Sequence, residues 1–227
     1  SSELKGHVVA RRGEDDNFRV VGVYNRAKQG YASHGETANN GKSSIAGLVV
    51  KLLPQSAVSH IPLSAFSDEK RIVNLAGKAA NVVDELTNQS IAGENFKAAV
   101  TGQPIEGRDL YRSAMTFYPR ALHLCTTNAL PTFSGGVDRG LQRRLVVLPF
   151  NRSIPDDEIV ADIADRIGDQ EMDLLMAFAI EGARRLVRNR AYTIPPSSAD
   201  ALKEWLLKDP VNAWFDEYGR IITGLKS

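Results

Sequence analysis

The stretch from Gly35 to Ser43, which ends in Asn40-Gly41-Lys42-Ser43, constrains this chain more than any other. Glycines let a backbone curl around an anion with its N–H groups pointing inward, a lysine meets the outer phosphates, and a hydroxyl holds Mg²⁺. An apolar run, Ile45–Leu53, follows and predicts a helix from Ser44, whose N-terminus would add positive potential. Five residues separate Gly35 from Gly41, one more than usual. The stretch predicts either a phosphate-binding loop or an ordinary surface loop.

Composition limits the class of protein without naming it. Hydrophobic residues make up 43% and charged residues 24% of the 227 residues, which is typical of a globular chain that buries a full core. The single cysteine excludes an intramolecular disulfide and a cysteine-rich zinc site, and it fits a reducing, cytoplasmic setting. No apolar run reaches the roughly 18 residues of a membrane span. Because the net charge is +1, any basic binding site must be local.

The order of apolar and helical stretches predicts an α/β fold with a central parallel sheet and a C-terminal helical appendage. Buried strands are expected at Ala79–Val83, Leu122–Thr127 and Arg144–Phe150, and helices at Ser67–Gly77 and Asn95–Thr101. After Pro155 the pattern is helical only, over Glu158–Ile167, Glu171–Val187, Ser198–Leu207 and Pro210–Tyr218. We divide the chain into a core of residues 31–152 and a helical region of residues 153–227. Residues 1–30 are expected to form a small β-hairpin, from His7–Arg12 and Phe18–Tyr24, or an extension at the sheet edge.

Two carboxylates, Asp84 and Glu85, end the first of these strands. In an ATPase one carboxylate at this place helps to hold Mg²⁺, and the other polarises the attacking water. The same pair also suits a helix N-terminus, where acidic side chains favour the helix dipole. Either interpretation fits the pair taken alone.

Two further polar sites follow in the order that an ATPase sheet requires. Asn128 ends the strand Leu122–Thr127, where it either reaches a γ-phosphate or forms a turn. Arg143 and Arg144 precede the last strand and are either a solvated surface pair or a finger that neutralises charge on a neighbouring subunit's nucleotide. Lys42 and Asp84 are 42 residues apart, and Glu85 and Asn128 are 43 apart. The order of these signals favours a nucleotide site.

A segment between the acidic pair and Asn128 carries spaced basic residues, Lys97, Arg108, Arg112 and Arg120. Gly102, Pro104 and Gly107 predict a hairpin or an extended loop over Gly102–Arg112. Arginine and lysine at a hairpin tip would contact nucleic-acid phosphates, and Tyr111 could stack on bases. The alternative is a loop with solvated charges, and Phe117 and Tyr118 are expected to pack in the core.

The motifs together resemble superfamily 3 helicases, and within them the C-terminal helicase domain of phage and plasmid primases. The resemblance extends from about Gly35 to Tyr218. Its motifs are Asn40-Gly41-Lys42-Ser43, Leu75-Ala76-Gly77-Lys78, Asp84-Glu85, Phe96–Gly102, Ile105–Arg108, Phe117-Tyr118-Pro119, Thr127–Pro131 and Arg143-Arg144 through Phe150. The long loop that ends in Asn-Gly-Lys-Ser is similar to the loop of that family.

The resemblance implies a modified AAA+ P-loop ATPase fold, assembled as a homo-hexameric ring with ATP between subunits. It implies an ATP-dependent replicative helicase that translocates on single-stranded DNA, separates fork DNA and works with a primase domain or protein. The setting it implies is the cytoplasm of a bacterial host cell of a phage or mobile element. The alternative is a non-catalytic, nucleotide-dependent assembly or loading module.

The resemblance also assigns residues. ATP would contact Gly35, Asn40, Gly41, Lys42, Ser43 and Ser44, and Mg²⁺ would contact Ser43 and Asp84. Glu85 would activate water and Asn128 would sense the γ-phosphate. Arg144, or else Arg143, would act in trans. A DNA-binding hairpin maps to Phe96–Arg120 and includes Lys97, Arg108 and Arg112.

Overall fold

A parallel five-stranded sheet forms the centre of the computed structural model, which describes residues 20–24, 40–84, 90–109, 111–128, 131–134, 142, 144–151 and 153–207. The strand order is β2-β3-β7-β1-β9. The strands are β1 (Val20–Tyr24), β2 (Val58–Ser59), β3 (Ala80–Val83), β7 (Leu122–Thr127) and β9 (Leu145–Pro149). The expected central parallel sheet, with strands at all three places named above, is confirmed.

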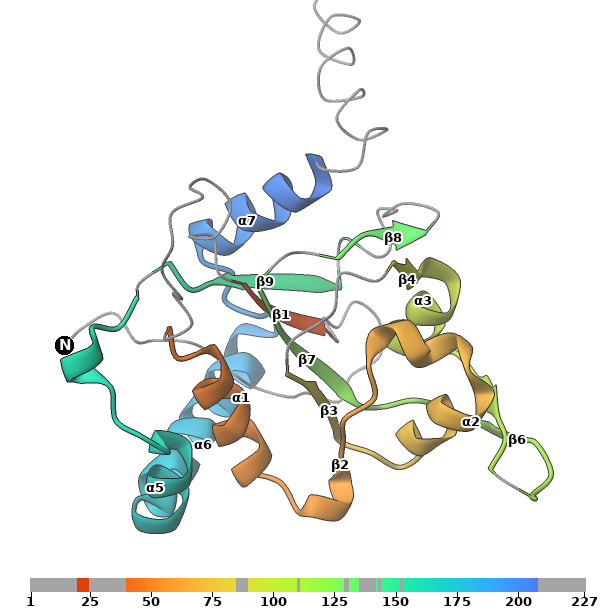
Figure 1. Ribbon diagram of the computed structural model, residues 1–227, viewed down its shortest axis with the longest axis horizontal. Helices are drawn as coiled ribbons and strands as arrows, with labels where there is room; N and C mark the ends of the chain where they lie inside the picture. Colours follow the sequence, from red (N-terminus) through yellow and green to blue (C-terminus); the bar gives the residue numbers. More distant parts are fainter. Residues whose placement is uncertain are drawn as a thin grey trace, which may run out of the picture.

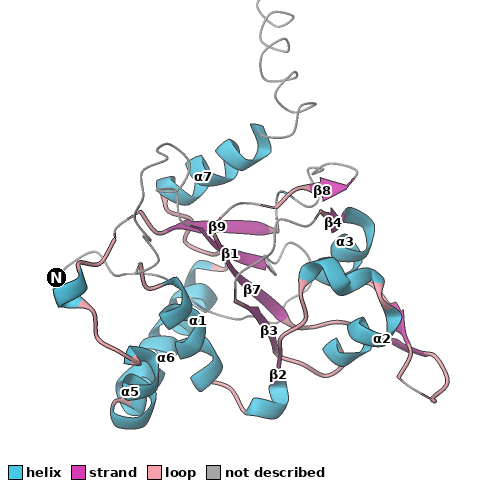
Figure 2. Ribbon diagram, viewed as in Figure 1, coloured by secondary structure: helices cyan, strands magenta, loops and turns pink. Residues whose placement is uncertain are grey.

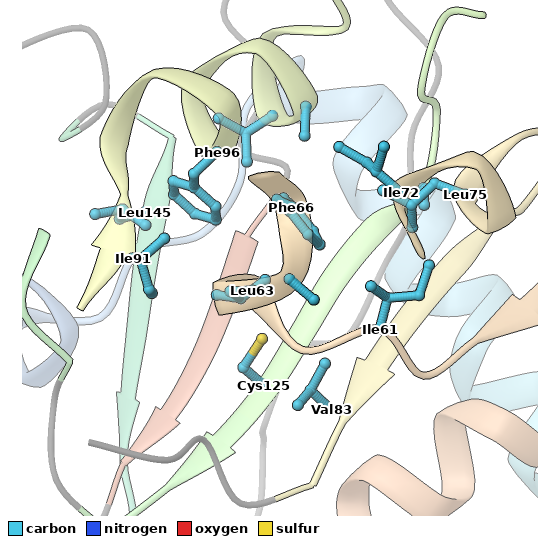
Figure 3. Packing of buried hydrophobic residues seen from close by; sticks show 14 of the residues in the cluster. Ile61, Leu63, Phe66, Ile72, Leu75, Val83, Ile91, Phe96, Cys125 and Leu145 are labelled. Carbon is cyan, nitrogen blue, oxygen red and sulfur yellow. The ribbon is translucent and has the colours of Figure 1, made fainter. Parts of the chain in front are cut away.

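Alternate residues of each strand point to opposite faces of the sheet, and helices pack against both faces. Leu124 and Val82 pack in a cluster with Ala46 and Val49 of α1 (Lys42–Lys51). Cys125 and Val147 pack in the other cluster, which Figure 3 shows. Figures 1 and 2 show α1, α5 (Ile163–Gln170) and α6 (Met172–Asn189) on one side of the strands. The other cluster includes residues of four short helices, namely η3 (Leu63–Ser67), α2 (Glu69–Ile72), η4 (Val73–Leu75) and α3 (Gly93–Thr101).

Helix α1 is present as predicted, although it begins at Lys42, two residues before the predicted start at Ser44. Gly41 is its N-cap, with φ +80°, a left-handed conformation that side chains larger than hydrogen disfavour. The helix ends just before Pro54, which cannot continue it. The predicted helix over Asn95–Thr101 is likewise confirmed as α3. The helix expected over Ser67–Gly77 is shorter and divided between α2 and η4.

The N-terminal prediction is wrong for Val20–Tyr24. This strand pairs with β7 on one side and with β9 on the other, so it lies inside the sheet and belongs to neither a hairpin nor an edge. Its backbone is hydrogen-bonded to a neighbouring strand on both sides. The order of strands along the chain does not predict this, because the order within a sheet depends on the crossover connections. His7–Arg12 lies outside the described residues.

After Pro155 the described residues are mainly helical, although the helix predicted over Glu158–Ile167 begins only at Ile163, and α7 (Pro196–Leu207) is no appendage. Its Ala201 and Trp205 are buried in the same cluster as Leu145 and Val147 of β9. The Trp205 indole Nε1 donates to the carbonyl of Pro131 over 2.9 Å, and its ring lies 5.5 Å from that of Phe133. Helix α7 therefore completes the core. Pro210–Tyr218 lies outside the described residues.

A small hairpin extends from the side of the α2 layer (Figure 1). Its strands are β5 (Ile105–Gly107) and β6 (Met115–Phe117), which pair antiparallel. The Arg108 N–H donates to the Glu69 carbonyl of α2 over 3.1 Å, and a Cβ at Gly107 would lie 2.8 Å from the Cβ of Val73. Of the two predicted alternatives, a hairpin and an extended loop, the structure has a hairpin, but its second strand lies beyond Arg112, and its base is held closely against α2 and η4.

Four short elements complete the described part of the chain. Strands β4 (Ile91–Ala92) and β8 (Phe133–Ser134) pair parallel beside α3, and η2 (Gln55–Ala57) and η5 (Asp156–Glu158) are single turns. Within the described residues, no helix is both long and apolar enough to cross a bilayer.

Candidate active site

The N-terminus of α1 lies against the carboxyl ends of β3 and β7. Lys42, at the first helical position, is 7% exposed. Its Nζ donates to Asn128 Oδ1 over 3.1 Å, just beyond the end of β7, and to Asn40 Oδ1 over 3.0 Å within the loop. Both acceptors are neutral amide oxygens, and together they hold the ammonium group between the loop and the end of β7.

A second contact joins the next residue of α1 to the strand end. Ser43 Oγ donates to Asp84 Oδ1 over 3.0 Å, and Asp84 directly follows β3. Thr126, near the end of β7, donates its Oγ1 to the same carboxylate oxygen over 2.5 Å. Lys42 and Ser43 are thus each connected to an adjacent strand end. The predicted grouping of Lys42, Ser43, Asp84 and Asn128 occurs in the structure.

Asn40 holds a buried donor that lacks an acceptor. The residue is 8% exposed, and within the described part of the chain its Nδ2 makes no hydrogen bond. Leaving a buried amide donor unpaired costs about 1–3 kcal/mol. A ligand with acceptor oxygens, bound beside Lys42, would remove that cost. That Asn40 contacts a phosphate stays a prediction.

The residues present fit Mg²⁺ on one condition. Among the described residues, no group of three His, Cys, Asp or Glu side chains could hold a metal ion by itself. Ser43 and Asp84 offer one hydroxyl and one carboxylate. Mg²⁺ in phosphate-transferring sites is held by one or two carboxylates, waters and the phosphates of the substrate. The donor set therefore fits Mg²⁺ together with a nucleotide.

The remaining predicted residues differ in position. Ser44 lies in the first turn of α1, next to Ser43, whereas Arg144 directly precedes β9 and is half-buried. Strand β1 separates β9 from β7, so Arg144, before the start of β9, and Asn128, after the end of β7, lie at different places on the sheet. Gly35, Glu85 and Arg143 lie outside the described residues.

Thr126 is the residue that our sequence reasoning missed. A usable signal was present, because residues two apart on a strand share a face. Leu124 packs on the α1 side, so Thr126 and Asn128 also belong to that side. By contrast, Cys125 faces the other cluster, and burial raises the pKa of its thiol to about 12. Cys125 is therefore a packing residue with an unreactive thiol.

The predicted nucleic-acid residues lie in two elements. Lys97 is on α3 and half-buried, whereas Arg108 and Arg112 are exposed in the hairpin. Arg112 Nε lies 3.7 Å from Asp109 Oδ2, an exposed pair that contributes little to stability. The structure does not bring Lys97 into the hairpin itself.

The aromatic side chains of the hairpin segment differ sharply in exposure. Phe117 is 7% exposed and packs in the core, as expected. Tyr118 is 63% exposed, so its predicted burial is wrong, because it follows the last hairpin residue and points to the opposite side from Phe117. Tyr111 is fully exposed and has φ +61°, which costs a non-glycine residue about 1 kcal/mol or more.

Comparisons with known proteins give a likeness in fold and no function. Residues 33–144 match a family model described as "Family of unknown function (DUF5906)". No curated protein matches the chain. The chain resembles an apo structure of the NrS-1 C-terminal region with a TM-score of 0.51 and 11% identity, over 79% of this chain and 38% of that one. The fold is therefore a mixed α/β fold like part of that region, and the chain spans well under half of its length.

Two weaker likenesses have TM-scores below 0.5. A second structure of the NrS-1 C-terminal region gives a TM-score of 0.47 and 14% identity, over 72% of this chain and 35% of that one. A structure of JCV helicase with a bound small molecule gives 0.41 and 10% identity, over 85% of this chain and 51% of that one.

Proposed function

We propose that this chain is the ATP-hydrolysing domain of a superfamily 3 replicative DNA helicase, of the type found in phage and mobile-element primase-helicases. The observation that carries the proposal is the convergence of α1 and two strand ends, where Lys42 meets Asn128 and Ser43 meets Asp84. Ligands of parallel α/β sheets bind beyond the carboxyl ends of the strands. The groups at that edge suit a nucleoside triphosphate, since they include a lysine, a hydroxyl, a carboxylate and an amide.

Phosphate binding would use groups that the fold already holds in place. The Lys42 ammonium group and the Asn40 Nδ2 are both donors beside the start of α1, and the first N–H groups of that helix point the same way. The Asn128 Oδ1 accepts from this ammonium group, and its Nδ2, the donor side of the same amide, would contact the γ-phosphate or the attacking water.

The metal would sit beside Ser43 and Asp84. Mg²⁺, when bound there, neutralises charge that develops on the phosphates. Glu85 follows Asp84 in the chain, and we propose that its carboxylate orients the attacking water. Arg144, or else Arg143, would act on the nucleotide of a neighbouring subunit in a homo-hexameric ring, with Gly35 and Ser44 completing the nucleotide contacts.

Single-stranded DNA would bind at the hairpin. Arg108 and Arg112 are exposed, and Tyr111 is fully exposed at a strained backbone position. Exposed arginines neutralise phosphates and an exposed aromatic ring can stack on a base. Lys97 on α3 would add a phosphate contact at the base of this surface. Strand separation at a fork, the primase partner and the cytoplasm of a bacterial host belong to the same proposal.

A paired experiment tests the catalytic part. We expect steady-state ATPase activity that single-stranded DNA stimulates. Lys42→Ala should bind nucleotide weakly and not turn over, because the loop loses its point charge. Glu85→Gln should bind nucleotide normally but hydrolyse it roughly 10²-fold more slowly or worse. Nucleotide binding without any turnover in the unmodified protein would favour the alternative, a non-catalytic assembly or loading module.

A further inference from the structure

The hydroxyl of Thr126 is the least expected contact in the candidate site. Thr126 is 2% exposed, and its Oγ1 donates to Asp84 Oδ1 over 2.5 Å. The sheet register accounts for this contact. Val83 is paired with Cys125, so the next residues along β3 and β7, Asp84 and Thr126, lie side by side and project to the same face.

Both hydroxyl donors at this carboxylate reach the same oxygen. Ser43 Oγ approaches Oδ1 from α1 and Thr126 Oγ1 approaches it from β7. No hydrogen bond within the described residues reaches the other oxygen, Oδ2, and Asp84 is an exposed residue. Two donors at Oδ1 fix the rotation of the carboxylate group about its Cβ–Cγ bond. Oδ2 is thereby left with free lone pairs on the accessible side.

We propose that Thr126 is a positioning residue that acts through Asp84 on a nucleotide-bound divalent cation. The inference rests on the proposed function, because it takes a Mg²⁺–nucleotide complex as the ligand. Groups that hydrogen-bond a metal-holding carboxylate keep it in one orientation, and their loss typically lowers metal affinity or activity by about 10–100-fold. Ser43 cannot replace Thr126 in this role, since its hydroxyl is itself a candidate metal ligand.

Three variants of the chain separate positioning from general damage to the strand. Thr126→Val keeps the shape and removes the donor, whereas Thr126→Ser keeps the donor. Thr127→Val is the matched control, because Thr127 is equally buried on the same strand and projects to the opposite face. Thermal unfolding of all three shows whether the fold is retained, and Thr126→Ala replaces Thr126→Val if the latter does not fold.

Metal binding is measured without turnover. Mn²⁺, as a paramagnetic probe for Mg²⁺, is titrated by electron paramagnetic resonance in the presence of a non-hydrolysable ATP analogue. A fluorescent nucleotide is titrated separately with and without Mg²⁺. Thr126→Val should weaken Mn²⁺ binding by about 10–100-fold and leave metal-free nucleotide binding unchanged. Thr126→Ser and Thr127→Val should bind Mn²⁺ like the unmodified protein.

The failures of the two proposals are distinguishable. An unmodified protein whose nucleotide binding does not depend on Mg²⁺ contradicts the proposed function. If the unmodified protein depends on Mg²⁺ and Thr126→Val binds Mn²⁺ equally well, the inference about Thr126 is overturned and the proposed function stands. An equal loss in Thr126→Val and Thr127→Val also overturns it, because the effect then belongs to the strand and not to the contact with Asp84.

Discussion

Replacing Asn40 with Asp should stabilise the nucleotide-free protein and at the same time strongly weaken nucleotide binding. The Asn40 Oδ1 accepts from Lys42 Nζ over 3.0 Å, and its Nδ2 is buried without a partner in the described part of the chain. The substitution keeps the shape of the side chain. It converts the neutral acceptor into a charged one, and it replaces the unpaired donor with an acceptor.

The stability gain can be estimated from the contact. The present bond already has one charged partner, and the substitution makes it an ion pair whose added attraction is partly offset by desolvation of the new carboxylate, so the pair should gain about 1 kcal/mol. For a chain of this size, that raises the melting temperature by about 2–4 °C. A phosphate about 4 Å from the new carboxylate would be repelled by about 4 kcal/mol at an effective dielectric constant of 20. Nucleotide affinity should therefore fall by about 10²–10³-fold.

Two measurements check the expected gain in stability and the expected loss of nucleotide affinity. Scanning fluorimetry without nucleotide gives the change in melting temperature, and titration of a fluorescent ATP analogue gives the change in affinity. Gln55→Glu is the control, because it makes the same chemical change at an exposed residue of η2. A variant Asn40→Asp that binds nucleotide as tightly as the unmodified protein, or melts several degrees lower, would refute the placement of Asn40 beside Lys42 and the phosphate.

Further predictions concern the hairpin, the ring and the buried thiol. Tyr111→Ala should weaken single-stranded DNA binding, measured by fluorescence anisotropy, by about 1–3 kcal/mol and leave binding to an abasic strand unchanged. Equal losses of affinity for the two strands would rule out stacking. Arg108→Ala should take about 0.7 off the slope of log affinity against log salt in the same assay, and an unchanged slope would rule out a phosphate contact. Arg144→Ala subunits, inactive alone, should regain ATPase activity when mixed with Lys42→Ala subunits, and no recovery in rings verified by sedimentation would count against a trans role. Burial raises the pKa of Cys125 above its unfolded value to about 12. The contribution of this thiol to stability is therefore constant below about pH 9 and is lost as the pH rises from about 9 to 12. Over that range, urea unfolding should show that the free energy of unfolding falls more steeply in the unmodified protein than in Cys125→Ala.

Local patterns along the chain determine much of this fold. The helix after Gly41 begins within two residues of its predicted start, because a glycine with φ +80° and a following apolar run are both local features. Strands β3 and β7 were predictable because fully buried strands are short apolar runs between polar ends. The predicted grouping of Lys42 with Asn128 followed from a single assumption, that the strands are parallel and share one carboxyl edge.

The tertiary structure decided what depends on neighbours that are distant in sequence. Val20–Tyr24 looked like an added element, yet it is the strand between β7 and β9, because pairing order is set by crossovers and not by local hydrophobicity. Helix α7 was expected to belong to an appendage, yet its Ala201 and Trp205 are buried in the core beside β9. The role of Thr126 could not be assigned from its own strand, since it requires the register that sets Val83 beside Cys125 and thus Asp84 beside Thr126. Residue types and spacing along one chain determine which groups can bind a phosphate, whereas the angle and distance at which they meet are determined only when the strands pair.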